Sequence, residues 1–329
     1  MNYTQLDNYF VGIINPKIQA FLNSSIGIQI RQNQDILQQN VFSNIILPEL
    51  NKLRSDKIKD LSNYTNRNTI VYYSGWLQAV RGNNDFSIVD NDMNGFMNAV
   101  CGLDKTKGLD LILHTPGGSI VATESIVSYL KKVFGKNIRV IVPHLAMSAG
   151  TMIACASKKI ILGKQSSLGP IDPQYRGVSA EGVIEEFNLA VTDTLASPNK
   201  SLIWKEIIGK YAPTFVGECQ KAIDLSKLLV TKWLKSNMFQ NSKNQTHEVK
   251  KIMDEISSHA STKTHDRHFD CETCKHMGLK VYKLENNSVF QDLILTIHHS
   301  FVLSFNRFPE MIKVIENDSR QTLITTGQR

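Results

Sequence analysis

Residues 109–119 read LDLILHTPGGS, an apolar run that passes directly into a proline–glycine–glycine turn. An apolar run of this length that ends in Pro116-Gly117-Gly118 indicates a buried strand followed by a tight turn. In the next residues, Ser119–Phe134, apolar side chains recur at helical spacing, and Gly135 is a typical helix stop. This stretch therefore predicts a strand, a glycine turn and an amphipathic helix in succession.

The same succession continues along the chain. Ile138–Val142 is a second apolar, β-branched run, Ser148–Ala156 is a short helix of small residues, and Ile160–Leu162 is a third strand that ends at Gly163. Strand–helix–strand repeats at this pitch favour a largely parallel sheet with right-handed crossovers. We therefore expect an α/β protein built from βαβ units.

Helical additions are predicted on both sides of this core. Apolar residues recur at steps of four and seven within residues 1–67, which fits a helical N-terminal arm. Ile26, Ile28 and Ile30 also alternate, as in a short strand. Residues from about 181 to 260 have helical spacing, and a last helix is expected over 290–305. The predicted division is a helical N-terminal arm at 1–67, the main domain at 68–300 and a C-terminal tail at 301–329.

Composition narrows the class of protein. The chain has 329 residues, is 42% hydrophobic and carries a formal net charge of +7, a mild excess that does not by itself indicate a nucleic-acid partner. Five cysteines are too few for a disulfide scaffold. No run approaches the roughly 18 apolar residues of a membrane helix, and the N-terminus lacks the pattern of a secretory signal. A cytoplasmic protein without a transmembrane segment is expected.

Two turns carry the candidate chemistry. Pro116-Gly117-Gly118 allows close approach of the backbone and exposes N–H groups that can stabilise an oxyanion or hold a phosphate. Ala146–Thr151 places Ser148 at the opening of a helix. Parallel sheets bind ligands at the carboxyl ends of their strands, where both turns are expected. A serine that faces paired glycine N–H groups is typical of hydrolases; a structural βα turn and an ordinary N-cap serine are the simpler alternatives.

Three segments, in this order and spacing, resemble a known family: LDLILHTPGGS (109–119), VIVPHLAMSAGTMIACA (140–156) and KQSSLGPIDPQ (164–174). Over about residues 68–300 the chain is similar to the Clp-fold serine peptidases of the crotonase-like superfamily. The match is most specific to the serine dehydrogenase proteinase (SDH) family, with signal peptide peptidase A and the Clp proteolytic subunit as more distant relatives. This resemblance implies a Clp/crotonase-like spiral of βαβ units and Ser148 as the nucleophile. It also implies an oxyanion hole made by the backbone N–H groups of Gly118 and Ala149, with Gly117 shaping the turn.

The resemblance does not identify which residue is the general base. Near the position of the Clp subunit's histidine, this chain reads PIDPQ (170–174) and has no histidine. Enzymes similar to signal peptide peptidase A use a desolvated lysine instead, and Lys200 lies at a comparable separation from Ser148. Lys200 is therefore the predicted base, and four other residues stay open as alternatives: Lys205, Lys210, His265 and Asp172.

A group of histidines and cysteines between residues 265 and 276 has spacing that invites a zinc assignment. Cys271–Gly278 reads as a short helix before a strand at Leu279–Tyr282, so Cys271 and Cys274 would share one buried helix face instead. We therefore predict no metal and no cofactor.

The resulting prediction is an ATP-independent serine endopeptidase. It would hydrolyse peptide bonds in peptides or unfolded proteins through an acyl-enzyme on Ser148, and it would form a homo-oligomer, as the resembled peptidases do. The alternatives are a scaffold or adaptor with a decayed site and a crotonase-type acyl-CoA enzyme, whose oxyanion hole is also built from backbone N–H groups.

Overall fold

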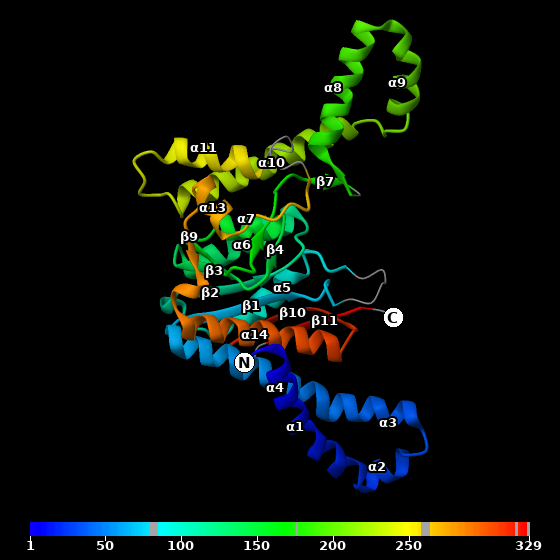
Figure 1. Ribbon diagram of the computed structural model, residues 1–329, viewed down its shortest axis with the longest axis vertical. Helices are drawn as coiled ribbons and strands as arrows, with labels where there is room; N and C mark the ends of the chain where they lie inside the picture. Colours follow the sequence, from blue (N-terminus) through cyan, green and yellow to red (C-terminus); the bar gives the residue numbers. More distant parts are fainter. Residues whose placement is uncertain (79–84, 176, 258–263, 320–321, 328–329) are drawn as a thin grey trace. The chain divides into compact units, whose positions relative to one another are not determined.

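The computed structural model describes residues 1–78, 85–175, 177–257, 264–319 and 322–327 (Figure 1). The end of the predicted 181–260 helical region therefore lies outside the described residues. The chain divides into two compact units. The first contains residues 1–86, 91–114 and 284–329, and the second contains residues 87–90 and 115–283.

The first unit is built on strands from distant parts of the chain. β1 (Asn68–Ser74) runs parallel to β2 (Leu109–His114) and antiparallel to β10 (Met311–Asn317), which pairs with β11 (Thr322–Thr326). Every residue of β1, β2 and β10 is buried, as the continuous apolar runs of β1 and β2 lead one to expect. The region 301–329, expected above to be a tail, thus contains two paired strands.

The helices of the first unit pack on one another through apolar side chains. An apolar cluster that includes Leu6, Phe10, Leu50 and Leu303 joins α1, α4 and α14. Ile26, Ile28 and Ile30 lie in a helix and not in a strand, because Ser24 accepts the N–H of Gly27 and starts helical structure there. The helical segments are α1 (Tyr3–Leu22), α2 (Ser25–Ile30), α3 (Gln34–Val41), a π-helical turn (Phe42–Ile46), α4 (Leu47–Thr65), α5 (Asp92–Val100), the 3₁₀ turns Lys105–Lys107 and Leu284–Asn286, and α14 (Ser288–Arg307).

Buried charges in this unit occur as ion pairs. Arg54 Nε lies 3.0 Å from Glu316 Oε2, and both side chains are at most 1% exposed. Lys313 Nζ lies 2.9 Å from Asp92 Oδ1 in a second buried pair. Burial raises the pKa of Glu316, and Arg54 opposes that rise. A charge buried in this way is tolerated because its partner compensates for the lost water.

The second unit holds a parallel sheet and two short ribbons. β5 (Lys159–Leu162) lies between β3 (Ile138–Val142) and β9 (Val281–Lys283), and all three run parallel. β4 (Leu145–Ala146) pairs with β6 (Ser167–Leu168), and β7 (Gln174–Tyr175) pairs with β8 (Val178–Ser179). The chain passes from β3 through a short helix to its neighbour β5, which is a βαβ unit. The expected α/β class is confirmed.

The second unit also contains a helical pair that extends past its strands. Figure 1 shows α8 and α9 as a helical pair beyond β7, and α8 packs on α10 through Ala180, Val183, Cys219 and Ile223. No helix of the described chain is both long and apolar enough to cross a membrane. The helical segments are α6 (Ile120–Phe134), α7 (Ala149–Cys155), α8 (Ala180–Ala196), a 3₁₀ turn (Pro198–Lys200), α9 (Ser201–Ile208), α10 (Phe215–Ser236), α11 (Gln245–Ile256) and α13 (Cys271–Met277).

Candidate active site

Ser148 occupies a sharp bend between β4 and α7. Its backbone has φ 49° and ψ −112°, a conformation that non-glycine residues rarely adopt. The bend is held by hydrogen bonds from the Gly150 N–H to the Met147 carbonyl (2.7 Å) and from the Met152 N–H to the Ser148 carbonyl (3.1 Å). Among the described residues the Ser148 side chain makes no capping hydrogen bond to the helix. The N-cap alternative therefore does not account for this serine.

The glycine turn packs directly against the serine. Gly117 and Gly118 have φ values of 106° and 152°. A Cβ on Gly117 would lie 2.8 Å from Ser148 Cβ, and a Cβ on Gly118 would lie 2.3 Å from the Ile88 backbone nitrogen, so neither position has room for a side chain. Hydrogen bonds from the Thr115 N–H to the Leu145 carbonyl and from the Met147 N–H to the Thr115 carbonyl, 3.0 Å each, tie the two turns together.

The N–H groups of this turn have different surroundings. Gly117 donates its N–H to Thr115 Oγ1 at 3.1 Å, which leaves it unsuited to bind an oxyanion. Among the described residues, neither the Gly118 nor the Ala149 N–H donates to a backbone carbonyl. The N–H groups of Gly118 and Ala149, which the resemblance implies as oxyanion donors, thus differ from the N–H of Gly117, which is already hydrogen-bonded within the turn.

Thr151 connects the bend at Ser148 to the loop that begins at Gly169. Its buried hydroxyl donates to the Ala146 carbonyl (2.9 Å) and accepts the N–H of Gly169 (2.9 Å). Gly169 begins the run Gly169-Pro170-Ile171-Asp172, so one side chain links the residues around Ser148 to the loop that carries Asp172.

Asp172 and His265 form a hydrogen-bonded pair. His265 Nδ1 lies 2.9 Å from Asp172 Oδ1; the carboxylate is fully buried and the imidazole is 21% exposed. The second oxygen of Asp172 has no hydrogen-bond partner within the described part of the chain. A carboxylate at Nδ1 holds the proton on that nitrogen and leaves Nε2 able to accept another.

Strand contacts bring this pair to the same side of the unit as Ser148. Leu168 of β6 pairs with Ala146 of β4 and also exchanges backbone hydrogen bonds with Phe269, four residues after His265. A hollow of about 410 Å³ opens at Ser148 and is walled by Ile171 and Pro173, which flank Asp172. Its other lining residues are largely apolar: Gly118, Ser119, Ile120, Val121, Met152, Gln174, Tyr175, Glu218, Lys221, Ala222 and Leu225.

The lysines predicted as bases have different surroundings. Lys200 lies in the 3₁₀ turn Pro198–Lys200, is 48% exposed and pairs with Asp193 Oδ1 at 2.8 Å. Lys205 and Lys210 are also exposed. A lysine base must be desolvated to lose its proton near neutral pH, and none of these three environments supplies that desolvation.

Cys271 and Cys274 share a buried face of α13, as expected of a structural helix. Cys274 donates its thiol to the Phe269 carbonyl at 3.5 Å, and burial raises the pKa of this thiol well above its usual range. His268 and His276 are exposed. Across the described ranges, no three His, Cys, Asp or Glu side chains gather as they would around a metal ion.

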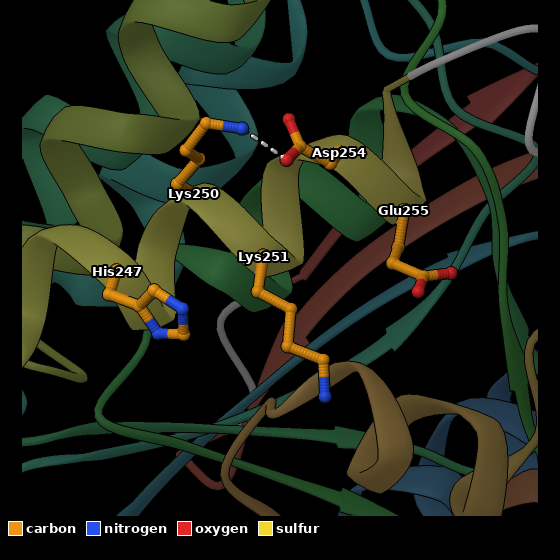
Figure 2. A pocket seen from close by; sticks show the side chains of 5 residues that line it. All are labelled: His247, Lys250, Lys251, Asp254 and Glu255. Carbon is orange, nitrogen blue, oxygen red and sulfur yellow. Dashed lines mark hydrogen bonds and ion pairs between the residues drawn. The ribbon is translucent and has the colours of Figure 1, made fainter.

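A second hollow, of about 550 Å³, lies on the exposed face of α11. Figure 2 shows its five lining side chains on this one helix, with Lys250 and Asp254 in an ion pair of 2.6 Å. Lys251 donates to the His276 carbonyl at 2.7 Å. Three of the five side chains are thus engaged in ion pairing or hydrogen bonding, and none of the described lining residues is a serine, threonine or cysteine, so we do not assign it chemistry.

A family model described as ClpP-like SDH-type serine proteinase matches residues 85–298. The chain belongs to this family. Two proteins of Methanocaldococcus jannaschii are similar to it. The uncharacterized protein MJ0137 is 32% identical over 194 residues, 59% of this chain and 60% of that protein. The uncharacterized protein MJ1495 is 44% identical over 79 residues, 24% of this chain and 27% of that protein. The chain thus covers less than two thirds of either relative.

Membership of the ClpP-like SDH-type serine proteinases agrees with the family resemblance of the three segments. The matched range 85–298 includes both turns, Asp172, Lys200 and His265. Within this SDH-type chain, the contact that sequence reasoning undervalued is the one between Asp172 and His265. Its signal is an acidic residue inside the apolar run LGPIDP, where a carboxylate is buried only with a partner.

Proposed function

We propose that this ClpP-like SDH-type serine proteinase hydrolyses peptide bonds through an acyl-enzyme on Ser148. The supporting observation is the conformation of Ser148, held at φ 49° against Gly117 with a side chain that caps no helix. A residue at a strained backbone position is unfavourable for folding and is typical of a functional site. The Ser148 hydroxyl is the attacking group in this proposal.

We assign His265, held by Asp172, as the general base in place of Lys200. The Nε2 atom of His265 accepts the Ser148 proton while Ser148 Oγ attacks the peptide carbonyl. The N–H groups of Gly118 and Ala149 stabilise the resulting oxyanion, each by about 3–4 kcal/mol. The amine then leaves with the proton from His265, and water releases the acyl group by the reverse proton path. Support comes from the 2.9 Å contact between His265 and a fully buried Asp172.

The hollow at Ser148 supports a peptide substrate. Ile120, Met152 and Leu225 present an apolar wall, and about 410 Å³ suits one substrate side chain with its adjoining backbone. The Glu218–Lys221 ion pair, at 2.9 Å, lies at the same hollow with exposed side chains. We therefore propose cleavage after apolar residues in unfolded chains or peptides, without ATP.

We also propose a homo-oligomer and a cytoplasmic location. Three side chains of the α8–α9 pair are strongly exposed for apolar residues: Leu195 (81%), Leu202 (73%) and Ile203 (63%). Apolar surface of this kind is typical of an interface. The five cysteines are all free, which suits a reducing compartment, and fractionation of cells that express the chain would test that location.

The mechanism is tested with four variants: Ser148→Ala, His265→Gln, Asp172→Asn and Lys200→Gln. Labelling by a fluorophosphonate and hydrolysis of casein without ATP are the readouts. Ser148→Ala should abolish both, and His265→Gln and Asp172→Asn should lower kcat by about 10²- to 10⁴-fold. Lys200→Gln should retain activity within about twofold.

The matched control is His247→Gln, which removes an exposed histidine of α11 in the same unit. If Lys200→Gln is inactive and His265→Gln is active, the general base is Lys200 and not His265. Hydrolysis of casein by Ser148→Ala at the wild-type rate would contradict the peptidase proposal, and a wild-type chain inert to every probe would favour a scaffold.

A further inference from the structure

The positive charge of the chain is concentrated in one segment. Residues 125–171 contain seven Lys or Arg residues and no Asp or Glu, and the formal net charge of the whole chain is +7. Several of these residues lie where α6 ends and where β3 and β5 begin, among them Lys132, Lys136 and Lys158. They are therefore at the amino ends of the parallel strands, whereas Ser148 follows the carboxyl end of β3.

Two lysines bind one turn in the second unit. Lys136 Nζ donates to the Gln240 side chain, and Lys280 Nζ donates to the Met238 carbonyl at 2.7 Å. Asn237, in the same turn, donates to the Ala156 carbonyl at 2.9 Å, two residues before Lys158. The turn 237–240 thus brings together lysines that are far apart in the sequence.

Lys131 and Lys232 extend this cluster along α6 and α10. Lys131 Nζ lies 5.9 Å from the centre of the Trp233 ring. Burial, together with the nearby charges of Lys136 and Lys232, lowers the pKa of Lys131 to about 8. We call Lys131, Lys132, Lys136, Lys158, Lys232 and Lys280 the basic surface.

No carboxylate of the described chain forms an ion pair with any lysine of the basic surface. Elsewhere in the same unit, Lys200, Lys221, Lys227 and Lys250 are each paired with an acidic side chain. Gathered like charges repel one another, and this repulsion is relieved when a polyanion binds and releases its counterions.

An exposed aromatic ring lies beside these lysines. Tyr282 of β9 is 49% exposed, stands two residues after Lys280, and has Lys159 Nζ 4.9 Å from its ring centre. Lysines with an aromatic ring among them suit a single strand, because phosphates pair with the lysines and a base stacks on the ring. A membrane would instead require several exposed apolar side chains for insertion. Near these lysines the described exposed ones are Tyr282 and, one turn before Lys232 on α10, Leu228.

We propose that the basic surface binds the phosphate backbone of single-stranded nucleic acid without sequence preference, with Tyr282 as a stacking platform. Lysine suits such a role because it is a point charge, whereas sequence readout favours the planar fork of arginine. The surface does not include Ser148, so binding is independent of the proposed peptidase activity, and Ser148→Ala should bind as wild type does.

The test is the fluorescence anisotropy of a fluorescein-labelled 20-nucleotide oligo-U or oligo-dT with the full chain, between 50 and 200 mM salt. The variant Lys136→Gln/Lys232→Gln should weaken binding at 50 mM salt about tenfold or more. It should also reduce the slope of log K against log salt by about 1.4, since each phosphate contact to a single strand contributes about 0.7. The control Lys57→Gln/Lys250→Gln removes two ion-paired lysines, one half-buried and one exposed, and should bind as wild type does.

Tyr282→Ala should weaken binding about tenfold with an unchanged salt slope, and Tyr282→Phe should restore it. Thermal melting of each variant checks that the fold is retained. An equal loss in the control pair would overturn the proposal, as would binding of poly-glutamate or of phosphatidylserine vesicles in preference to the oligonucleotides. Equal binding of a 20-base-pair duplex, with no effect of Tyr282→Ala, would overturn the single-strand assignment.

Discussion

Gly117→Ala tests the geometry at Ser148 without removing any catalytic group. The added Cβ would lie 2.8 Å from Ser148 Cβ and 2.8 Å from the Met147 carbonyl oxygen, at a backbone φ of 106°. Carbon atoms in contact prefer about 3.5–4.0 Å, so the turn must move by about 1 Å. Strain from an alanine at this φ adds roughly 1–3 kcal/mol.

Two separate effects are expected of Gly117→Ala. The strain should lower Tm by about 2–4 °C for each kcal/mol in a unit of this size. A displacement of about 1 Å at the reacting groups should lower kcat/KM about 100-fold. Differential scanning calorimetry measures the first effect, and the rates of fluorophosphonate labelling and peptide hydrolysis measure the second.

Gly135→Ala is the matched control. Gly135 follows α6 with φ 61°, and a Cβ there would meet nothing within 4 Å. Its alanine variant should lose about 1 kcal/mol of stability and keep wild-type kcat/KM within about twofold. The reasoning is refuted if Gly117→Ala remains as active as wild type, or if Gly135→Ala loses as much activity.

Three further predictions concern other contacts. Thr151→Val should lower kcat at least tenfold with little change in KM, because it removes the hydrogen bonds to Ala146 and Gly169. Thr151→Ser should restore kcat. Unchanged kinetics in Thr151→Val would exclude a positioning role for Thr151. Arg54→Ala should cost about 3–5 kcal/mol in urea unfolding because Glu316 is left buried without its partner. Burial raises the pKa of Glu316 in the folded state, so this loss should be smallest at low pH and grow as the pH rises through that pKa; a loss independent of pH contradicts it. Leu195→Glu/Leu202→Glu should lower the molar mass measured by light scattering if α8 and α9 form the oligomer contact, and an unchanged mass would place the contact elsewhere.

The local sequence predicts much of the fold and the two turns at which the candidate site lies. The strands, the glycine turns and α6 could be predicted because each is encoded within a few neighbouring residues. Close approach of the backbone at Gly117 and Gly118 was expected because glycine tolerates positive φ and leaves room there. The positive φ of Ser148 was not expected from the sequence. The glycine stop at Gly278 and the three-residue spacing of Cys271 and Cys274 likewise indicated the helix α13 with a buried cysteine face.

Contacts between distant residues could not be predicted in the same way. Asp172 and His265 are separated by 93 positions, and no local pattern joins them. β10 pairs with its sequence neighbour β11 on one side, but its other partner is β1, which lies toward the opposite end of the chain, and no local pattern predicts that pairing. The environment of Lys200 depends on Asp193, seven residues earlier, and the number of lysines in a sequence does not show whether a given lysine is desolvated.

The backbone of Ser148 implies a conflict between folding and chemistry at a single residue. Glycine adopts positive φ without the penalty that serine carries there, about 1–2 kcal/mol, so Ser148→Gly should melt above the wild type while it loses all labelling by a fluorophosphonate. A variant that is both inactive and no more stable would show that the bend carries no such penalty. On stability alone glycine would be the better residue at this position, so under the proposed mechanism the serine supplies a reactive hydroxyl at the expense of folding free energy.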